Sequence, residues 1–303
     1  MRPLPSGEGP VILAADVGGT KTWLALFRAG GTDSAAPLTL LRSAKHSSRA
    51  AASLEQLVGE FLQDEHARAD YACFGLPGPI TGERIKLVNL PWDVDSAGLA
   101  AKFGLRGCFL INDLVANAYG IGELAPDDFA VLHAGAPDAS GNMAVISPGT
   151  GLGEAGIFWD GRKHIPFACE GGHCDFAPRT ELELALLKHL FEPYGHVSFE
   201  RVLSGSMGIP NIYAFLRDTG RAAETPAIAE LLKHNDTGAV ISTAAADASC
   251  PLCVQTMQLF TSILGAEAGN LALKAMATGG VFIGGGIAAK TLHLLRQPQL
   301  LEA

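Results

Sequence analysis

The sequence predicts an α/β protein, and three stretches lead to this class. Residues 108–120 combine a short apolar run, the polar pair Asn112–Asp113 and apolar residues at helical spacing, which indicates a buried strand, a polar turn and a helix. Two further stretches, 11–27 and 143–159, each place a turn of glycine and threonine between two apolar, strand-like runs. Because ligands of open α/β sheets bind at the carboxyl ends of strands, the Asn112–Asp113 stretch is also a candidate site.

Length and composition narrow the class further. The 303 residues can form one large or two moderate domains with an ample core. The formal net charge of -9 and the lack of a dense basic stretch argue against a nucleic-acid partner. No apolar run is long enough to cross a bilayer, and residues 1–10 have the composition of a flexible leader, not of a signal peptide.

The cysteines argue against a disulfide framework and against a metal held directly by the protein. Six cysteines scattered over a chain of this length are typical of reduced thiols in the cytoplasm. Cys250 and Cys253 form a CxxC motif, but no second pair stands at zinc-binding spacing, and the neighbours His173 and Cys174 form no obvious zinc cage. We therefore expect ordinary thiols.

The first half of the chain predicts a meander of strands and then alternating helices and strands. Apolar runs indicate the strands, and apolar residues three and four apart indicate the helices. The expected strands are 11–15, 22–27, 38–42, 71–75, 85–88 and 109–111, and the expected helices are 50–65, 93–103 and the one that follows Asp113. Two Pro- and Gly-rich loops, 76–80 and 89–92, suggest a rigid rim around a cleft.

The second half predicts another sheet and then a mainly helical region. The expected strands are 127–132, 143–146, 155–159, 163–167 and 281–283, and the expected helices are 181–190, one that begins at Ser198, 207–217 and 288–296. Residues 226–276 have a mostly helical pattern with a break near Cys250 and Pro251.

The two glycine turns are candidate phosphate-binding loops. In Asp16–Thr20 two adjacent glycines can point amide groups at an anion, Asp16 could hold a hydrated Mg²⁺, and the Thr20 hydroxyl could donate to a phosphate oxygen. On this sequence alone, a plain type I′ hairpin turn is an equal alternative. The turn at 147–153 repeats the design, which favours two amide cradles for one polyphosphate over two ordinary hairpins.

Three further groups of residues are candidate ligand contacts. Gly284–Gly286 at a strand-to-helix junction could accept a flat ring or a phosphate, although the spacing is not that of a Rossmann site. Asn112 and Asp113 could bind a hydroxyl-rich ligand and remove a proton from it, unless Asp113 only caps the following helix. His173, with Glu170 three residues earlier, could be a ligand or a structural histidine, and Glu200 by itself could be a solvated helix residue.

Five segments of the chain, in this order, resemble the bacterial glucokinase family within the sugar kinase/Hsp70/actin superfamily. The segments are ADVGGT (15–20), LINDLVANAYG (110–120), SPGTGLGEAGIFWDG (147–161), EGGHCDFAPRTELE (170–183) with HVSFERVLSG (196–205), and GGVFIGGGI (279–287). The resemblance implies a two-domain, actin-like ATPase (ribonuclease H-like) fold with a deep interdomain cleft. It places a smaller α/β domain at 1–122 and a larger one at 123–303.

The resemblance also implies the roles of individual residues. Asp113 is the catalytic base for the 6-hydroxyl of glucose, and Asn112, Glu170, His173 and Glu200 are the other sugar-binding residues. Asp16, Gly18, Gly19 and Thr20 resemble the first phosphate loop, Gly149, Thr150 and Gly151 the second, and Gly284, Gly285 and Gly286 the adenosine segment. The cofactors are ATP and Mg²⁺, with no direct protein ligand to the metal and Asp16 reaching it through water.

The activity implied is that of a cytoplasmic, homodimeric glycolytic transferase that makes glucose 6-phosphate from D-glucose and ATP. The alternatives are a kinase for another hexose or amino sugar, a polyphosphate-dependent kinase, and a sugar sensor without catalysis. A sugar-responsive repressor is disfavoured, because no helix-turn-helix precedes Ala15 and the cysteine cluster of the repressor/ORF/kinase group is missing. The family also has a further strand and helix after the adenosine segment, where this sequence ends at Ala303.

Overall fold

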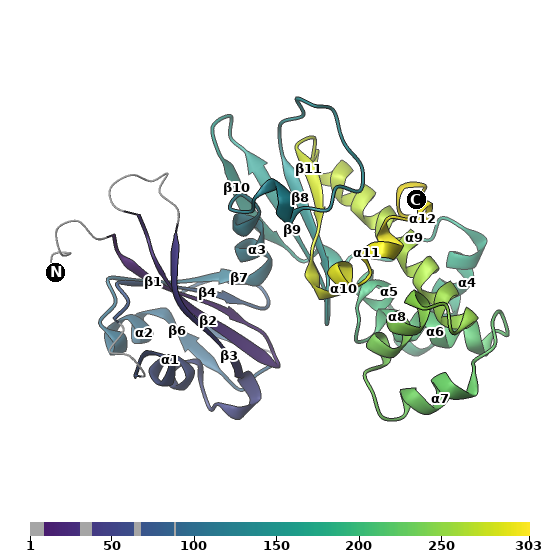
Figure 1. Ribbon diagram of the computed structural model, residues 1–303, viewed down its shortest axis with the longest axis horizontal. Coiled ribbons are helices and arrows are strands. Elements are labelled where there is room, and N and C mark those ends of the chain that lie inside the picture. The colour runs from purple at the N-terminus through teal and green to yellow at the C-terminus, as the bar shows by residue number, and fades with distance from the viewer. Residues whose placement is uncertain (1–8, 31–37, 64–67, 88) are drawn as a thin grey trace. The chain divides into compact units, whose positions relative to one another are not determined.

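The computed structural model describes residues 9–30, 38–63, 68–87 and 89–303. The chain divides into two compact units, Met1–Asn117 and Ala118–Ala303 (Figure 1). Three parts of the predicted elements lie outside the described residues: most of the expected leader, the end of the helix predicted at 50–65 and the last residue of the strand predicted at 85–88. Each unit is built around its own sheet.

The first unit has a five-stranded sheet in the order β3-β2-β1-β4-β7. Its strands are β1 (Val11–Val17), β2 (Lys21–Arg28), β3 (Thr39–Ser47), β4 (Tyr71–Leu76) and β7 (Gly107–Asn112). The first three form an antiparallel meander, and β4 and β7 continue the sheet parallel to β1. Asp16 is in register with Gly75, and Gly75 with Ile111, so the carboxyl ends of three parallel strands lie level at one edge.

One face of this sheet packs against two helices. Alternate residues of β1 and β2 are buried, as expected for a strand with one covered face, whereas the central strand β4 is buried throughout its last three residues. Helices α1 (Leu54–Gln63) and α2 (Ser96–Phe103) contribute to the same core, α1 through Leu57, Val58 and Phe61. A short hairpin, β5 (Arg84–Lys86) with β6 (Asp93–Asp95), lies beside them in the chain, and a single 3₁₀ turn spans Ser48–Ala50.

The second unit repeats the strand arrangement of the first. Its four strands, in the order β10-β9-β8-β11, are β8 (Met143–Pro148), β9 (Leu152–Trp159), β10 (His164–Cys169) and β11 (Gly280–Ile283). As in the first unit, a three-stranded antiparallel meander is extended by a strand parallel to its first member. The two glycine turns predicted from the sequence occupy the same place in each unit, between the first and second strands.

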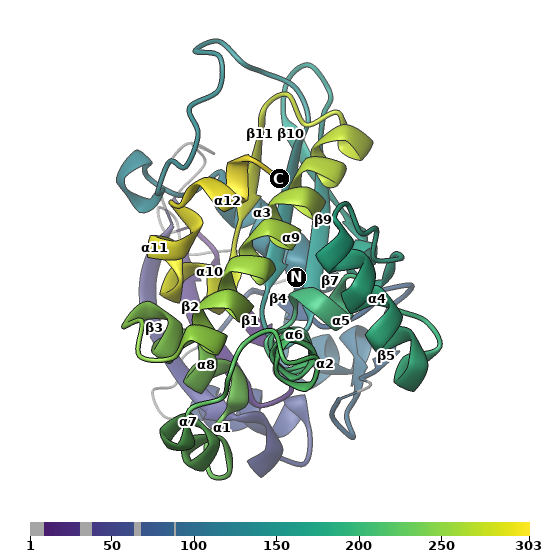
Figure 2. The same ribbon diagram turned by 90° about the vertical axis from the view of Figure 1, so that its right-hand side faces the viewer.

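Helices cover the sheet of the second unit and build most of its core. The long helix α9 (Pro251–Ala275), labelled in Figure 2, packs against β8 and β11. The other helices of this unit are α4 (Glu181–Tyr194), α5 (Glu200–Leu203), α6 (Gly208–Asp218), α7 (Pro226–Leu232), α8 (Thr237–Ala246), α10 (Gly285–Lys290), α11 (Leu292–Leu295) and α12 (Pro298–Leu301), with 3₁₀ turns at Pro126–Asp128 and Gly171–His173. Helix α3 (Asp113–Ile121) begins in the first unit and ends in the second. Within the described part of the chain, no single helix has the length and apolar character needed to span a membrane. Helices α8 and α9 have them only as a pair, and the two helix axes are bent by 100° at the break between them.

Two predicted elements differ from the structure because of non-local pairing. Residues 127–132 were expected to form a strand, but Pro126–Asp128 is a 3₁₀ turn and no strand follows it before β8. The two sides of β8 are already paired with β9 and β11, so this segment has no free edge there. Residues 93–103 were expected to be helical throughout, but Asp93–Asp95 pairs with β5, and the helix begins at Ser96, where the Asp95 carboxylate accepts hydrogen bonds from the Ala97 and Gly98 N–H groups.

Two smaller differences concern burial and helix continuity. The strand predicted at 109–111 is longer and only partly buried, with Phe109 57% exposed, because β7 pairs with β4 alone and forms the edge of its sheet. The helix predicted at 288–296 begins earlier and is divided into α10 and α11 at Thr291, whose hydroxyl donates to the Ile287 carbonyl oxygen (2.8 Å). The strand before it, β11, is only half-buried.

Candidate active site

The turn after β1 is held by hydrogen bonds to its carbonyl groups and by one of its own amide groups. The Gly18 N–H donates to the Lys21 carbonyl oxygen (3.0 Å), and Ser48 binds the Gly18 and Thr20 carbonyl oxygens through its hydroxyl and its N–H group (2.7 and 3.0 Å). Among the described residues, the N–H groups of Gly19 and Thr20 donate no hydrogen bond. This leaves two adjacent donors for an anion.

The type I′ alternative for this turn is wrong. That turn requires positive φ at both central residues, and none of the residues 18–20 has a positive φ. The paired glycines are therefore not explained by turn handedness. At Gly19 the available space favours glycine, because a Cβ there would lie 3.3 Å from the Asn89 Cβ atom.

Asn112, not Asp113, caps helix α3. The Asn112 Oδ1 atom accepts hydrogen bonds from the N–H groups of Leu114 (3.0 Å) and Val115 (3.2 Å), which is the geometry of an N-cap residue. Its amide nitrogen donates to the Gly78 carbonyl oxygen (3.1 Å), and the side chain is buried. The Asp113 Oδ1 atom accepts a hydrogen bond from the N–H group of the next residue, Leu114 (2.9 Å), so the cap of this helix is formed by Asn112.

The first unit brings Asp16 and Asp113 to the same edge of its sheet. Gly75 of β4 lies between them, and a Cβ there would sit 3.4 Å from the Ala15 carbonyl oxygen and 3.6 Å from the Asp113 Cα atom. The strand between the two acidic residues is thus narrow enough for the start of α3 to approach β1. Partial shielding from water raises the pKa of Asp16, although its side chain is exposed at the surface of the unit.

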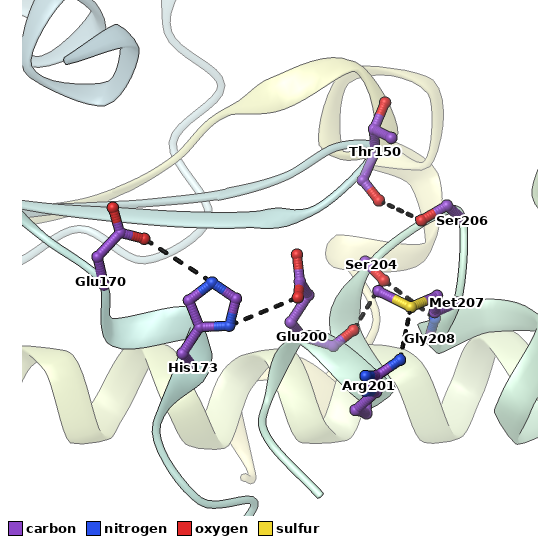
Figure 3. Close-up of polar contacts among 9 residues, drawn as sticks. All are labelled: Thr150, Glu170, His173, Glu200, Arg201, Ser204, Ser206, Met207 and Gly208. Atoms are coloured by element: carbon purple, nitrogen blue, oxygen red, sulfur yellow. Dashed lines mark hydrogen bonds and ion pairs between the residues drawn. The ribbon is translucent and has the colours of Figure 1, made fainter. Parts of the chain in front are cut away.

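The second glycine turn is anchored to the loop after α5. The Gly149 carbonyl oxygen accepts a hydrogen bond from the Gly205 N–H (2.8 Å), and the Thr150 carbonyl oxygen accepts one from the Ser206 hydroxyl (2.7 Å; Figure 3). As in the first unit, the carbonyl groups of the turn are bound to protein. The Thr150 side chain is exposed.

The glycine segment after β11 packs against the base of this second turn. The Gly284 N–H donates to the Ile146 carbonyl oxygen (2.8 Å). Gly285 has a φ of +83°, and a Cβ there would lie 2.6 Å from the Pro148 carbonyl oxygen, so only glycine fits. Gly286 follows in the first turn of α10 and is exposed. The second phosphate-loop candidate and the adenosine candidate are therefore neighbours.

Glu170, His173 and Glu200 form one cluster in the second unit. The His173 ring lies between the two carboxylates, with Nε2 3.9 Å from Glu170 Oε2 and Nδ1 3.6 Å from Glu200 Oε2 (Figure 3). Glu170 and His173 are more than half exposed, whereas Glu200 is 21% exposed. Glu200 also borders the glycine turn, since a Cβ at Gly151 would lie 2.6 Å from its Oε1 atom.

Next to this cluster lies a carboxyl group that was not among the residues predicted from the sequence. Glu154 of β9 is 2% exposed, and a Cβ at Gly171 would overlap its Oε2 atom. Burial, with the nearby charge of Glu267, raises the pKa of Glu154 to about 7. The available signal was an acidic residue at an inward-facing position of an otherwise apolar strand.

Comparison with solved structures shows the class of protein. A glucokinase from an Antarctic psychrotroph matches 97% of this chain and 88% of its own, with a TM-score of 0.81 and 32% sequence identity. A glucokinase from Balamuthia mandrillaris in complex with glucose has a TM-score of 0.75 at 22% identity, covering 99% and 87%. A ROK family glucokinase from Streptomyces griseus in complex with glucose and AMPPNP has a TM-score of 0.62 at 19% identity, covering 96% and 90%. The fold is that of the actin-like sugar kinases, which confirms the predicted fold class.

Sequence comparison identifies the family within this class. The glucokinase family model matches residues 13–303. The glucokinase of Nostoc punctiforme is 41% identical over 96% of this chain and 88% of the relative, and that of a Synechocystis species is 38% identical over 97% and 88%. The chain belongs to the glucokinase family.

Proposed function

We propose that the protein transfers the terminal phosphoryl group of ATP to the 6-hydroxyl of D-glucose. The observation that carries this proposal is Asp113, a carboxylate at the carboxyl edge of the first sheet whose capping task is taken over by Asn112. Family membership and the two glycine turns agree with it. In the cytoplasm such an enzyme would supply glucose 6-phosphate to glycolysis.

Asp113 would act as the general base. A sugar hydroxyl becomes a better nucleophile when a carboxylate accepts its proton, and a base at the end of a strand is held rigidly by the sheet. Asn112 would fix the approach of Asp113 and contribute its remaining amide proton to a sugar oxygen, because its Oδ1 and one N–H bond are already used in the protein.

Glu170, His173 and Glu200 would bind the other hydroxyl groups of the same glucose. Carboxylates accept hydrogen bonds from hydroxyl groups, and a histidine held between two carboxylates presents a defined ring orientation. This set belongs to the second unit and Asp113 to the first, and we propose that both contribute to glucose binding.

The two glycine turns and Gly284–Gly286 would bind ATP. Gly19 and Thr20 offer amide donors in the first turn, beside Gly18, whose own N–H group is used within the turn. Gly149, Thr150 and Gly151 form the second turn, and in the neighbouring Gly284–Gly286 segment Gly286 has open space where the adenosine would lie. Mg²⁺ would accompany the phosphates and neutralise their charge; the exposed Asp16 carboxylate suits its hydrated ion. Closing around the substrates would exclude water that otherwise hydrolyses ATP.

A coupled assay of sugar phosphate formation tests the proposal and its alternatives together. We expect glucose with ATP to have a higher kcat/KM than mannose, fructose or N-acetylmannosamine, and ATP to be preferred over polyphosphate. If an amino sugar is turned over in preference to glucose, the proposed substrate is wrong. If glucose binds without turnover, the protein is a sugar sensor and not a kinase. Sedimentation analysis of the same preparation tests the proposed homodimer.

Replacing Glu200 by alanine should lower kcat/KM for glucose about 10- to 100-fold, mainly through KM. The reason is that a hydrogen bond to a charged group contributes about 1.5–3 kcal/mol, and His173 would lose one of its two carboxylate neighbours. Glu192→Ala, an exposed residue of α4, is the matched control and should change nothing. An unchanged KM in Glu200→Ala would remove this residue from the sugar site.

A further inference from the structure

Glu154 is a buried carboxyl group directly under the segment that carries Glu170 and His173. It faces Cys169 across the β9–β10 pairing, so it lies where β10 runs into that segment. No side-chain atom fits between its Oε2 atom and the backbone of Gly171. The carboxyl group and the sugar-binding segment are therefore in direct contact, and a movement of one displaces the other.

The surroundings of Glu154 favour its neutral form. Its Oε1 atom is buried without a hydrogen-bond partner among the described residues. The acidic residue that acts on it, Glu267 of α9, is fully buried and binds Lys274 (3.2 Å) and Asn270 (2.8 Å). Because Lys274 is already engaged by Glu267, an ionised Glu154 would add a second negative charge for one cation.

Other titratable groups around Glu154 do little to stabilise the negative charge of its ionised form. Burial raises the pKa of the Cys169 thiol at the end of β10, which keeps it uncharged at neutral pH. The charges of Glu154, and of Glu170 and Cys174 in the loop after β10, each raise the pKa of this thiol as well. On the α9 side only Lys274 lowers the pKa of Glu154, against burial and Glu267, which raise it.

We propose that Glu154 is a positioning residue: in its protonated form it supports the Glu170–His173 segment in the sugar-binding arrangement, and its ionisation weakens glucose binding. An ionised carboxylate that has no donor gains free energy by moving toward water. The sugar-binding segment covers that route, and Gly171 provides no bulk to resist the movement. The inference rests on the proposed role of Glu170 and His173 in holding glucose.

The test is the pH dependence of KM for glucose, with kcat recorded at saturating ATP, for the wild type and Glu154→Gln. We expect the wild-type KM to rise about fivefold or more between about pH 6 and pH 9, with a midpoint near the Glu154 pKa. In Glu154→Gln, which cannot ionise, this rise should be lost. His173 is present in both enzymes, so the difference between the two profiles reports Glu154 alone.

A variant of Lys274 provides an independent measurement, with the midpoint of thermal unfolding as a check because Lys274 also pairs with the buried Glu267. Lys274 is 54% exposed, and Lys274→Gln removes a cation that favours ionised Glu154, so the midpoint of the KM profile should move to higher pH. Glu192→Gln should leave the profile unchanged. Superimposable profiles for wild type and Glu154→Gln, or an unmoved midpoint in Lys274→Gln, would overturn the proposal.

Glu170→Gln separates this inference from the proposed function. If Glu170→Gln raises KM while Glu154→Gln leaves the pH profile intact, the sugar site stands and the role of Glu154 does not. If Glu170→Gln and His173→Ala both leave KM unchanged, the sugar-site assignment itself is wrong.

Discussion

Asp113→Asn is expected to lower kcat about 10²–10⁴-fold, because an amide cannot accept the proton of the attacking hydroxyl. The substitution is close to isosteric, and Asn retains the oxygen that accepts the Leu114 N–H, so the start of α3 should persist. The cap itself belongs to Asn112, which is unaltered. KM for glucose should therefore change much less than kcat. The measurement is steady-state kinetics in the coupled assay, with the far-UV spectrum and the midpoint of thermal unfolding as checks on folding.

A matched control distinguishes loss of a base from loss of any negative charge. Asp160→Asn changes an exposed carboxylate that accepts the Arg162 and Lys163 N–H groups in the turn after β9, and kcat should stay at the wild-type value. An Asp113→Asn enzyme with near-normal kcat would show that another group takes the proton, and the role proposed for the strand end would have to be given up.

Glu154→Gln is expected to increase the free energy of unfolding by about 2–3 kcal/mol above neutral pH and to have almost no effect at about pH 4. The reference pKa of a glutamate is 4.5, whereas burial and then the charge of Glu267 raise the pKa of Glu154 in the folded protein to about 7. Between these two values the native state binds more protons than the unfolded state, so the wild type loses stability as the pH rises through this window. Gln cannot ionise, so the variant does not lose this free energy of unfolding as the pH rises.

Denaturant unfolding at several pH values measures this difference directly, in the absence of sugar and ATP. Glu192→Gln serves again as the exposed control and should follow the wild type at every pH. A Glu154→Gln variant that is equally destabilised at low and high pH would mean that the amide fits the site poorly and that ionisation of Glu154 has little weight there.

Most of the strands and helices could be predicted from the sequence because their signals are local. The apolar runs at 11–15, 71–75 and 143–146 lie within β1, β4 and β8, and the glycines that follow two of them mark the turns of both meanders. The strand predicted at 127–132 was wrong for the opposite reason. Whether an apolar segment pairs depends on a free strand edge, and that is decided by distant parts of the chain.

The candidate site, too, was only partly predictable from the sequence. By itself, the sequence determined which groups are available: two glycine turns, the Asn112–Asp113 pair, and the acidic residues and histidine of the 170–200 region. Only the tertiary structure decided that Asn112 is the cap, that His173 stands between two carboxylates, and that Glu154 is buried against Gly171. The residue types and their order are properties of the chain, whereas the partner, burial and charge state of a side chain depend on residues far away in sequence, such as Glu267 beside Glu154, which only folding brings into contact.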